Sequence, residues 1–239
     1  MGEILSLVLL LSSWILLSIQ RTLPSPWDVL TYISGLEPKR LLSHVLLTLF
    51  NSTSGFSLAL ISSLALGVVS HRSHLVRGFT GGICSVFNST SALIWSLVLV
   101  STVGVLSPLS PILVVAAVTF PQLLSTVTTA LDSVDRQLLE VVRSLGGSPI
   151  DEYFDIIIPS SLPALISSSR IAVGLGLRIS VVAEAFGSSG GIGYMIMRSY
   201  NLADIRGVLA WSLLLIILVI TVDYVILRSI EKRSMRWSR

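Results

Sequence analysis

The chain has 239 residues, of which 12% are charged and 52% hydrophobic, and its mean hydropathy is +0.86. Soluble domains carry about 25% charged residues, so this composition excludes a soluble domain and predicts a polytopic membrane protein in contact with lipid. The net charge is only +3, and no basic run interleaved with aromatic residues lies in the middle of the chain, which argues against a nucleic-acid partner.

The first apolar run covers residues 4–19. We interpret it as a membrane span rather than a signal peptide, because Glu3 precedes it without any Lys or Arg. No cleavage site with small residues follows it before Arg21. The next segment, residues 22–40, is expected to be a polar connector in which Trp27 favours the membrane interface.

Five further apolar runs are predicted to be spans, and a helix at residues 41–50 is expected to lead into the first of them. They are residues 55–69, 83–103, 111–131, 164–183 and 207–227. The sequence therefore predicts an all-α polytopic membrane protein with about six transmembrane helices in one domain, residues 1–239. Within it, residues 1–40 hold the first span and connector, 41–230 the core, and 231–239 a basic tail.

The distribution of positive charge predicts the orientation. If the N-terminus is cytoplasmic, then alternation of the spans puts residues 71–77, 132–163 and 228–239 on the cytoplasmic side. This side holds nine lysines and arginines, and the opposite side holds five. The positive-inside rule thus favours cytoplasmic N- and C-termini and a cytoplasmic segment 132–163.

The segment 132–163 is a polar island that is expected to form two short helices at an angle. Asp132 or Asp135 is a candidate cap for the first helix, which the pair Gly146-Gly147 ends because glycine tolerates the left-handed conformation. Ser148 is expected to cap the second helix, and Pro159 to stop it. Such amphipathic helices need a surface to pack on, which is either the chain's own membrane helices or a separate soluble subunit.

This segment resembles the cytoplasmic loop of permease subunits of ATP-binding-cassette importers. That loop has the pattern Glu-Ala-Ala, three residues, Gly, nine residues, Ile-x-Leu-Pro. The matching positions here are Glu140, Val141, Val142, Gly146, Ile156, Ile158 and Pro159, with valines in place of the alanines and Ile158 in place of the leucine. The resemblance implies a fold like that of type I importer permeases, with a coupling loop that docks on an ATPase subunit.

The same resemblance implies the partners and the location. They are a cytoplasmic ATPase subunit, a second permease copy in a homodimer and an extracytoplasmic solute-binding protein, all at the cell (inner) membrane. No cofactor is expected in this chain, because neither Lys39 nor Lys232 follows a glycine as a phosphate-binding loop requires. ATP and Mg²⁺ are expected on the partner ATPase, and the chain itself is not expected to be an enzyme.

A second stretch resembles the nitrate, sulfonate and taurine branch of these permeases. Ala183-Glu184, Gly187 and Gly191-Ile192-Gly193-Tyr194 fit its pattern, although the run from Gly187 to Gly193 also reads as a flexible outer turn. The resemblance implies a small anion as substrate, such as a sulfonate, taurine or nitrate, or else a small solute such as a vitamin precursor. Many members carry Pro-Pro where this chain has Asn88-Ser89-Thr90-Ser91, a polar run that either lines a path or bonds across helices.

Two charged residues in or at the end of the fifth span are candidates for the translocation path. A charge at the membrane centre costs at least about 2.5–3.5 kcal/mol, so Arg178 and Glu184 are expected to face a cavity or a partner. Arg178 either attracts an anionic solute or pairs with Glu184. No metal site is expected, because His71 and His74 lack acidic neighbours and Cys84 is the only cysteine.

Two other classes of membrane protein fit an apolar chain: an ATP-independent channel or secondary transporter, and a scaffold without transport. A secondary transporter is expected to carry several intramembrane acids, or broken helices with internal symmetry. The chain offers only Asp223 in the last predicted span and Glu184 directly after the fifth, which favours the importer permease.

Overall fold

The computed structural model describes residues 12, 14–16, 18, 23–104, 106–134, 136–144, 146–148 and 151–227. Its elements are α2 (Pro26–Ser34), α3 (Pro38–Arg72), α4 (His74–Ser89), α5 (Ala92–Val103), α6 (Leu109–Asp132), α7 (Arg136–Ser144), η1 (Glu152–Ile157), α9 (Ile158–Gly187), α10 (Ile192–Asn201), α11 (Ile205–Thr221) and η2 (Val222–Leu227). Over these residues the protein is all helical, as predicted. The predicted first span lies outside the described residues except for residues 12, 14–16 and 18, which are helical, and so does the tail.

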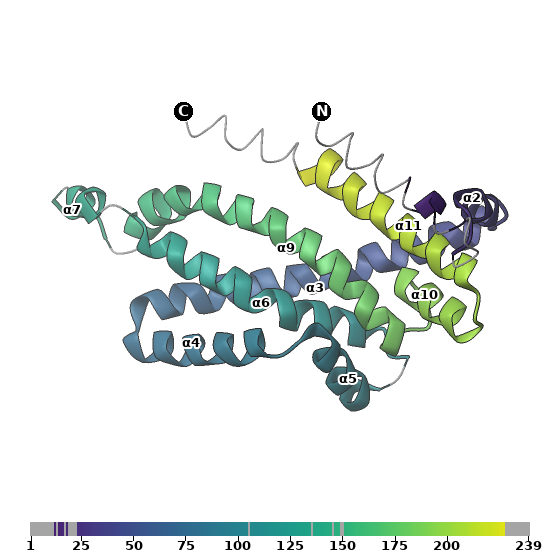
Figure 1. Ribbon diagram of the computed structural model, residues 1–239. Coiled ribbons are helices and arrows are strands. Elements are labelled where there is room, and N and C mark those ends of the chain that lie inside the picture. The colour runs from purple at the N-terminus through teal and green to yellow at the C-terminus, as the bar shows by residue number, and fades with distance from the viewer. Residues whose placement is uncertain are drawn as a thin grey trace.

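The centre of the molecule is α6, which packs lengthwise between α3 and α9 (Figure 1). The buried residues Val114 and Val115 of α6 meet Ile179 and Ala183 of α9 in an apolar cluster. On the other side, Gly55 of α3 lies against α6 so closely that a Cβ atom there would lie 2.6 Å from the carbonyl oxygen of Ile112. A glycine at this position therefore allows the two backbones to approach closely.

Four of the described helices are long and apolar enough to cross a membrane, and they confirm four of the predicted spans. They are Pro38–Arg72, Leu109–Asp132, Asp155–Gly187 and Ile205–Tyr224. The segment predicted to lead into the second span is continuous with it, since α3 runs for 35 residues. Together with the bent pair α4–α5, the described residues give up to five spans, so they do not establish the predicted six.

The span predicted at residues 83–103 is not one continuous helix. Helices α4 and α5 meet at an angle of 99°. Thr90 is extended and ends α4, and the Ser91 hydroxyl accepts a hydrogen bond of 3.4 Å from the Ile94 N–H and so caps α5. The hydroxyls of Ser89 and Thr90 donate to the Val86 carbonyl. This polar run therefore bonds within its own segment, because Ser and Thr compete for backbone groups at helix ends.

Two short helices also depart from the expectations. The segment predicted as a connector contains α2, which begins with Pro26 and a capping box between Ser25 and Asp28. Helix α10 starts directly after Gly191, where the sequence analysis assigned no helix. Helices α2 and α10 and the start of α11 lie together at the end of the bundle that is opposite α7 (Figure 1).

Candidate functional site

The loop that resembles the coupling loop projects from one end of the bundle. Helix α7 packs mainly on η1 (Figure 1). It exposes Glu140 and Val141, whereas Val142 is half-buried. Gly146 has φ +82°, and the Gly147 N–H donates to the Val142 carbonyl at 2.9 Å. This arrangement confirms the predicted helix end, which requires a left-handed residue that glycine adopts without strain.

The second half of the loop begins with the predicted cap. The Asp151 carboxylate accepts hydrogen bonds from the Ser148 N–H at 2.7 Å and from the Ser148 hydroxyl at 2.8 Å. The Ser148 hydroxyl in turn accepts a bond from the Asp151 N–H at 3.4 Å. These bonds, the backbone one first, lower the pKa of the Asp151 carboxyl below its usual value.

The expectation that Pro159 ends this second helix is wrong. The π-helical turns of η1 continue directly into α9, and this local change of helical geometry accommodates the missing N–H of Pro159 at the start of α9. Ile157 is buried, Ile156 and Ile158 are half-buried, and Pro159 is exposed. The loop's second half and the fifth span thus form one uninterrupted helical rod.

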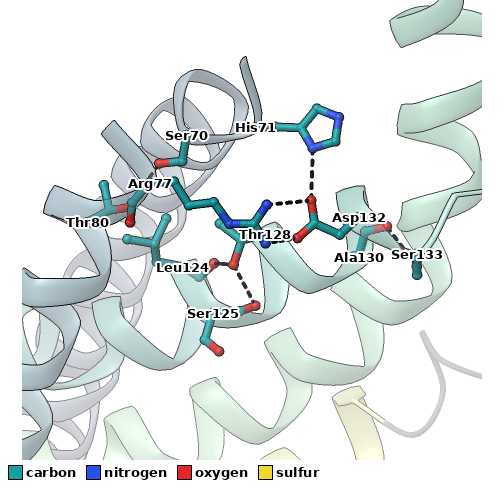
Figure 2. Close-up of polar contacts among 10 residues, drawn as sticks. All are labelled: Ser70, His71, Arg77, Thr80, Leu124, Ser125, Thr128, Ala130, Asp132 and Ser133. Carbon is teal, nitrogen blue, oxygen red and sulfur yellow. Dashed lines mark hydrogen bonds and ion pairs between the residues drawn. The ribbon is translucent and has the colours of Figure 1, made fainter. Parts of the chain in front are cut away.

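Asp132 does not cap the first loop helix. Asp132 is instead the last residue of α6. Its carboxylate accepts hydrogen bonds from the Arg77 guanidinium and contacts the His71 ring (Figure 2). The other candidate cap, Asp135, lies outside the described residues. His74 is exposed on α4 and is not part of this group.

An open cavity of about 880 Å³ lies between α6, α9 and the last helix. It is lined by Gln122, Ser167, Arg170, Ile171, Gly174, Leu175, Arg178, Val219, Ile220, Asp223 and Tyr224. The Arg170 guanidinium donates to both carboxylate oxygens of Asp223, at 3.0 and 3.1 Å. Arg178 is exposed in this cavity, and among the described residues it forms no ion pair.

Glu184 lies apart from that cavity and is fully buried. Its carboxylate accepts hydrogen bonds from the Thr48 hydroxyl (2.8 Å), the Asn51 amide (2.9 Å), the Ser180 hydroxyl (3.0 Å) and the Gly193 N–H (3.1 Å). All four donors are neutral, so within the chain Glu184 does not form the considered pair with Arg178. The fold brings it instead to two polar residues of α3 that the sequence analysis did not single out.

The glycine-rich turn after α9 is held by the same part of α3. The Gly191 N–H donates to His44 Nδ1 at 3.1 Å, and the Ile192 N–H donates to the Thr48 hydroxyl at 2.9 Å. Gly190 and Gly191 are buried. The turn is therefore a fixed junction between α3, α9 and α10, which corrects its interpretation as a flexible turn.

Comparisons with known proteins agree with this architecture. The family model described as "Binding-protein-dependent transport system inner membrane component" matches residues 55–236. The putative aliphatic sulfonates transport permease protein SsuC of Bacillus subtilis is 24% identical over 216 residues, which are 90% of this chain and 78% of the relative. The taurine transport system permease protein TauC of Escherichia coli is 23% identical over 221 residues, 90% of this chain and 80% of the relative.

Among solved structures, a chain of the MetNI methionine ABC transporter in an inward-facing conformation superposes with a TM-score of 0.71. The match covers 83% of this chain and 99% of that chain at 18% identity. At this identity the likeness establishes a shared fold.

Proposed function

The chain belongs to the family of inner-membrane components of binding-protein-dependent transport systems and is a permease subunit of an ABC importer, and from this premise we propose how it is driven and what it carries. It is a multi-pass membrane protein whose family is a transport component and not itself catalytic. Its partners are a cytoplasmic ATPase subunit, a second permease copy and a solute-binding protein on the outer side. The loop and both termini then lie in the cytoplasm.

The ATPase subunit docks on the coupling loop formed by α7, Gly146 and η1. Exposed side chains of α7, among them Glu140 and Val141, supply the docking face. The observation that carries this proposal is the continuous path from η1 into α9, because a displacement of the loop is transmitted along an unbroken helix. Closure of the ATPase dimer around ATP thereby biases the bundle between inward-open and outward-open states.

The solute path includes the cavity that Arg178 lines, and the solute is a small anion such as a sulfonate, taurine or nitrate. An exposed guanidinium without an ion-pair partner in the described chain is available to attract an anion. Gln122 and Ser167 in the same cavity offer hydrogen-bond donors to its oxygens. The names of SsuC and TauC support the sulfonate class.

Reconstitution tests this proposal. Proteoliposomes that contain the permease and its ATPase, with binding protein outside and ATP inside, are assayed for uptake of labelled taurine, alkanesulfonates, nitrate and an uncharged pyrimidine. We expect ATP-dependent uptake of one of the anions. Uptake at full rate without the ATPase would contradict the importer mechanism, whereas ATP-driven uptake of the uncharged solute alone would contradict only the substrate class.

A further inference from the structure

At the end of the bundle that carries the coupling loop, one carboxylate joins the ends of three helices. Asp132 closes α6, His71 lies at the end of α3, and Arg77 lies in the first turn of α4 (Figure 2). His71 Nδ1 lies 3.1 Å from Asp132 Oδ1, and Arg77 donates to both Asp132 oxygens. The turn between α3 and α4, residues 71–77, is thus tied to the end of α6.

The same turn also contacts the coupling loop itself. Arg72 places its guanidinium carbon 4.7 Å from the ring centre of Tyr153, in the geometry of a cation–π contact. The His71 ring meets the Tyr153 ring edge-on, at 6.1 Å and 86°. Because Tyr153 belongs to η1, the loop and the α3–α4 turn are in direct contact.

Beneath these polar contacts lies an apolar cluster that joins the same elements. Val127 and Leu131 of α6 and Ile157 of η1 are buried together, with Val68 of α3 and Tyr153 packed against them. Tyr153 therefore contacts this apolar cluster as well as Arg72 and His71.

The contribution of these polar contacts to stability is expected to be small. The side chains of Arg77 and Asp132 are 52% and 33% exposed, and ion pairs at such exposure stabilise a fold by about 0–1 kcal/mol. What the contacts do provide is geometry, since each one joins two elements that the backbone does not connect directly at that point. Their effect is therefore on relative movement of the helices.

We propose that the Asp132 ion pairs and the Tyr153 contacts form a bracket that makes the α3–α4 turn follow the coupling loop. This inference rests on the proposed function of the loop. A displacement of η1 reaches α9 through the continuous helix, and it reaches α3 and α4 through Tyr153. Asp132 then keeps α6 in register with that turn. Asp132 and Tyr153 act as positioning residues, and without them ATP hydrolysis moves α9 without moving the whole bundle.

The test measures solute transported per ATP hydrolysed in the full reconstituted transporter, for Asp132→Asn, Arg77→Gln, their double variant and Tyr153→Leu. We expect the permease to assemble with its ATPase and the ATPase to keep its activity. The transport-to-ATP ratio should fall about two- to tenfold in each single variant, as for residues on a coupling route between sites. The double variant should be no worse than Asp132→Asn, because Asp132→Asn already removes the charge with which Arg77 pairs.

His74→Gln is the matched control, since His74 is exposed in the same turn and lies outside the bracket. If Asp132→Asn and Tyr153→Leu keep the wild-type transport-to-ATP ratio in a transporter that imports solute with ATP, the bracket is overturned and the proposed function is left intact. A wild-type chain that neither binds the ATPase nor imports solute would instead refute the proposed function. If Asp132→Asn fails to assemble, Tyr153→Leu decides alone, because it leaves the ion pairs in place.

Discussion

Glu184 in α9 accepts a hydrogen bond of 2.8 Å from Thr48 in α3, although 136 residues separate them. The Thr48 hydroxyl also accepts a hydrogen bond from the Ile192 N–H, and the Glu184 carboxylate accepts one from the Gly193 N–H. Two side chains thus hold the start of α10 against α3 and α9. A buried carboxylate is tolerated here because its oxygens are saturated with donors.

Glu184→Ala is predicted to destabilise the protein by about 3 kcal/mol or more, because it leaves several buried donors without an acceptor. Glu184→Gln keeps one acceptor oxygen and should lie between the alanine variant and wild type. Thermal unfolding in detergent, followed by tryptophan fluorescence, measures the difference; Trp211 is fully buried against α10 and reports on this region. Equal melting temperatures for all three proteins would show that the hydrogen bonds do not stabilise the junction.

The sequence predicted features that depend on local chemistry better than features that depend on contacts between distant residues. The end of α7 at Gly146 and the cap at Ser148 follow from residues within one turn, and both were predicted correctly. The bonds of Glu184 to Thr48 and Asn51 join α9 to α3, so no local pattern indicated them.

Two errors concern the local chemistry of helix ends instead. Proline was expected to stop a helix at position 159, but the π-helical turns of η1 lead directly into α9 and accommodate its missing N–H. The span predicted at residues 83–103 is broken at residues 88–91, where Ser and Thr hydroxyls compete for backbone groups.

Arg178→Gln is predicted to lower anion uptake about tenfold or more. The contact between the Arg178 guanidinium and a partly desolvated anion is expected to contribute more than about 1.4 kcal/mol. Assembly with the ATPase should not change, since Arg178 lies in the cavity and not in the loop. Uptake by proteoliposomes and co-purification measure the two properties. Arg198→Gln, which changes an exposed arginine of α10, is the control; wild-type uptake by Arg178→Gln would remove Arg178 from the path.

The ion pair of Arg170 with Asp223 is predicted to show strong coupling in a double-mutant cycle. Asp223→Leu alone removes the carboxylate that pairs with the partly buried Arg170 and should destabilise the protein by about 1–2 kcal/mol. The double variant Arg170→Leu/Asp223→Leu removes both charges and should recover most of this loss. Chemical denaturation in detergent provides the free energies, and simple additivity of the two single effects would rule out the coupling.

The start of η1 is predicted to loosen in acid. Ser148 lowers the pKa of Asp151 in the folded state. The cap therefore stabilises the loop fully above the unfolded pKa, about 3.9, and loses this contribution as pH falls through the lower folded pKa. Hydrogen exchange of the amides that follow, compared with Asp151→Asn at each pH, measures the effect. The two proteins should differ at pH 7 and converge as the pH falls through the folded pKa of Asp151; a constant difference at every pH would contradict the cap.

The proposal that a partner ATPase drives this chain through the loop is tested most directly by comparing two glycines. A Cβ atom at either Gly146 or Gly78 meets no atom within 4 Å, but only Gly146 has a positive φ. A residue other than glycine at position 146 is destabilised by roughly 1–2 kcal/mol in this left-handed conformation. Co-purification of the ATPase should fall about tenfold for Gly146→Val and stay near wild type for Gly78→Val. Equal recovery of the ATPase with both variants, and with Glu140→Ala, would show that the loop is not its docking site.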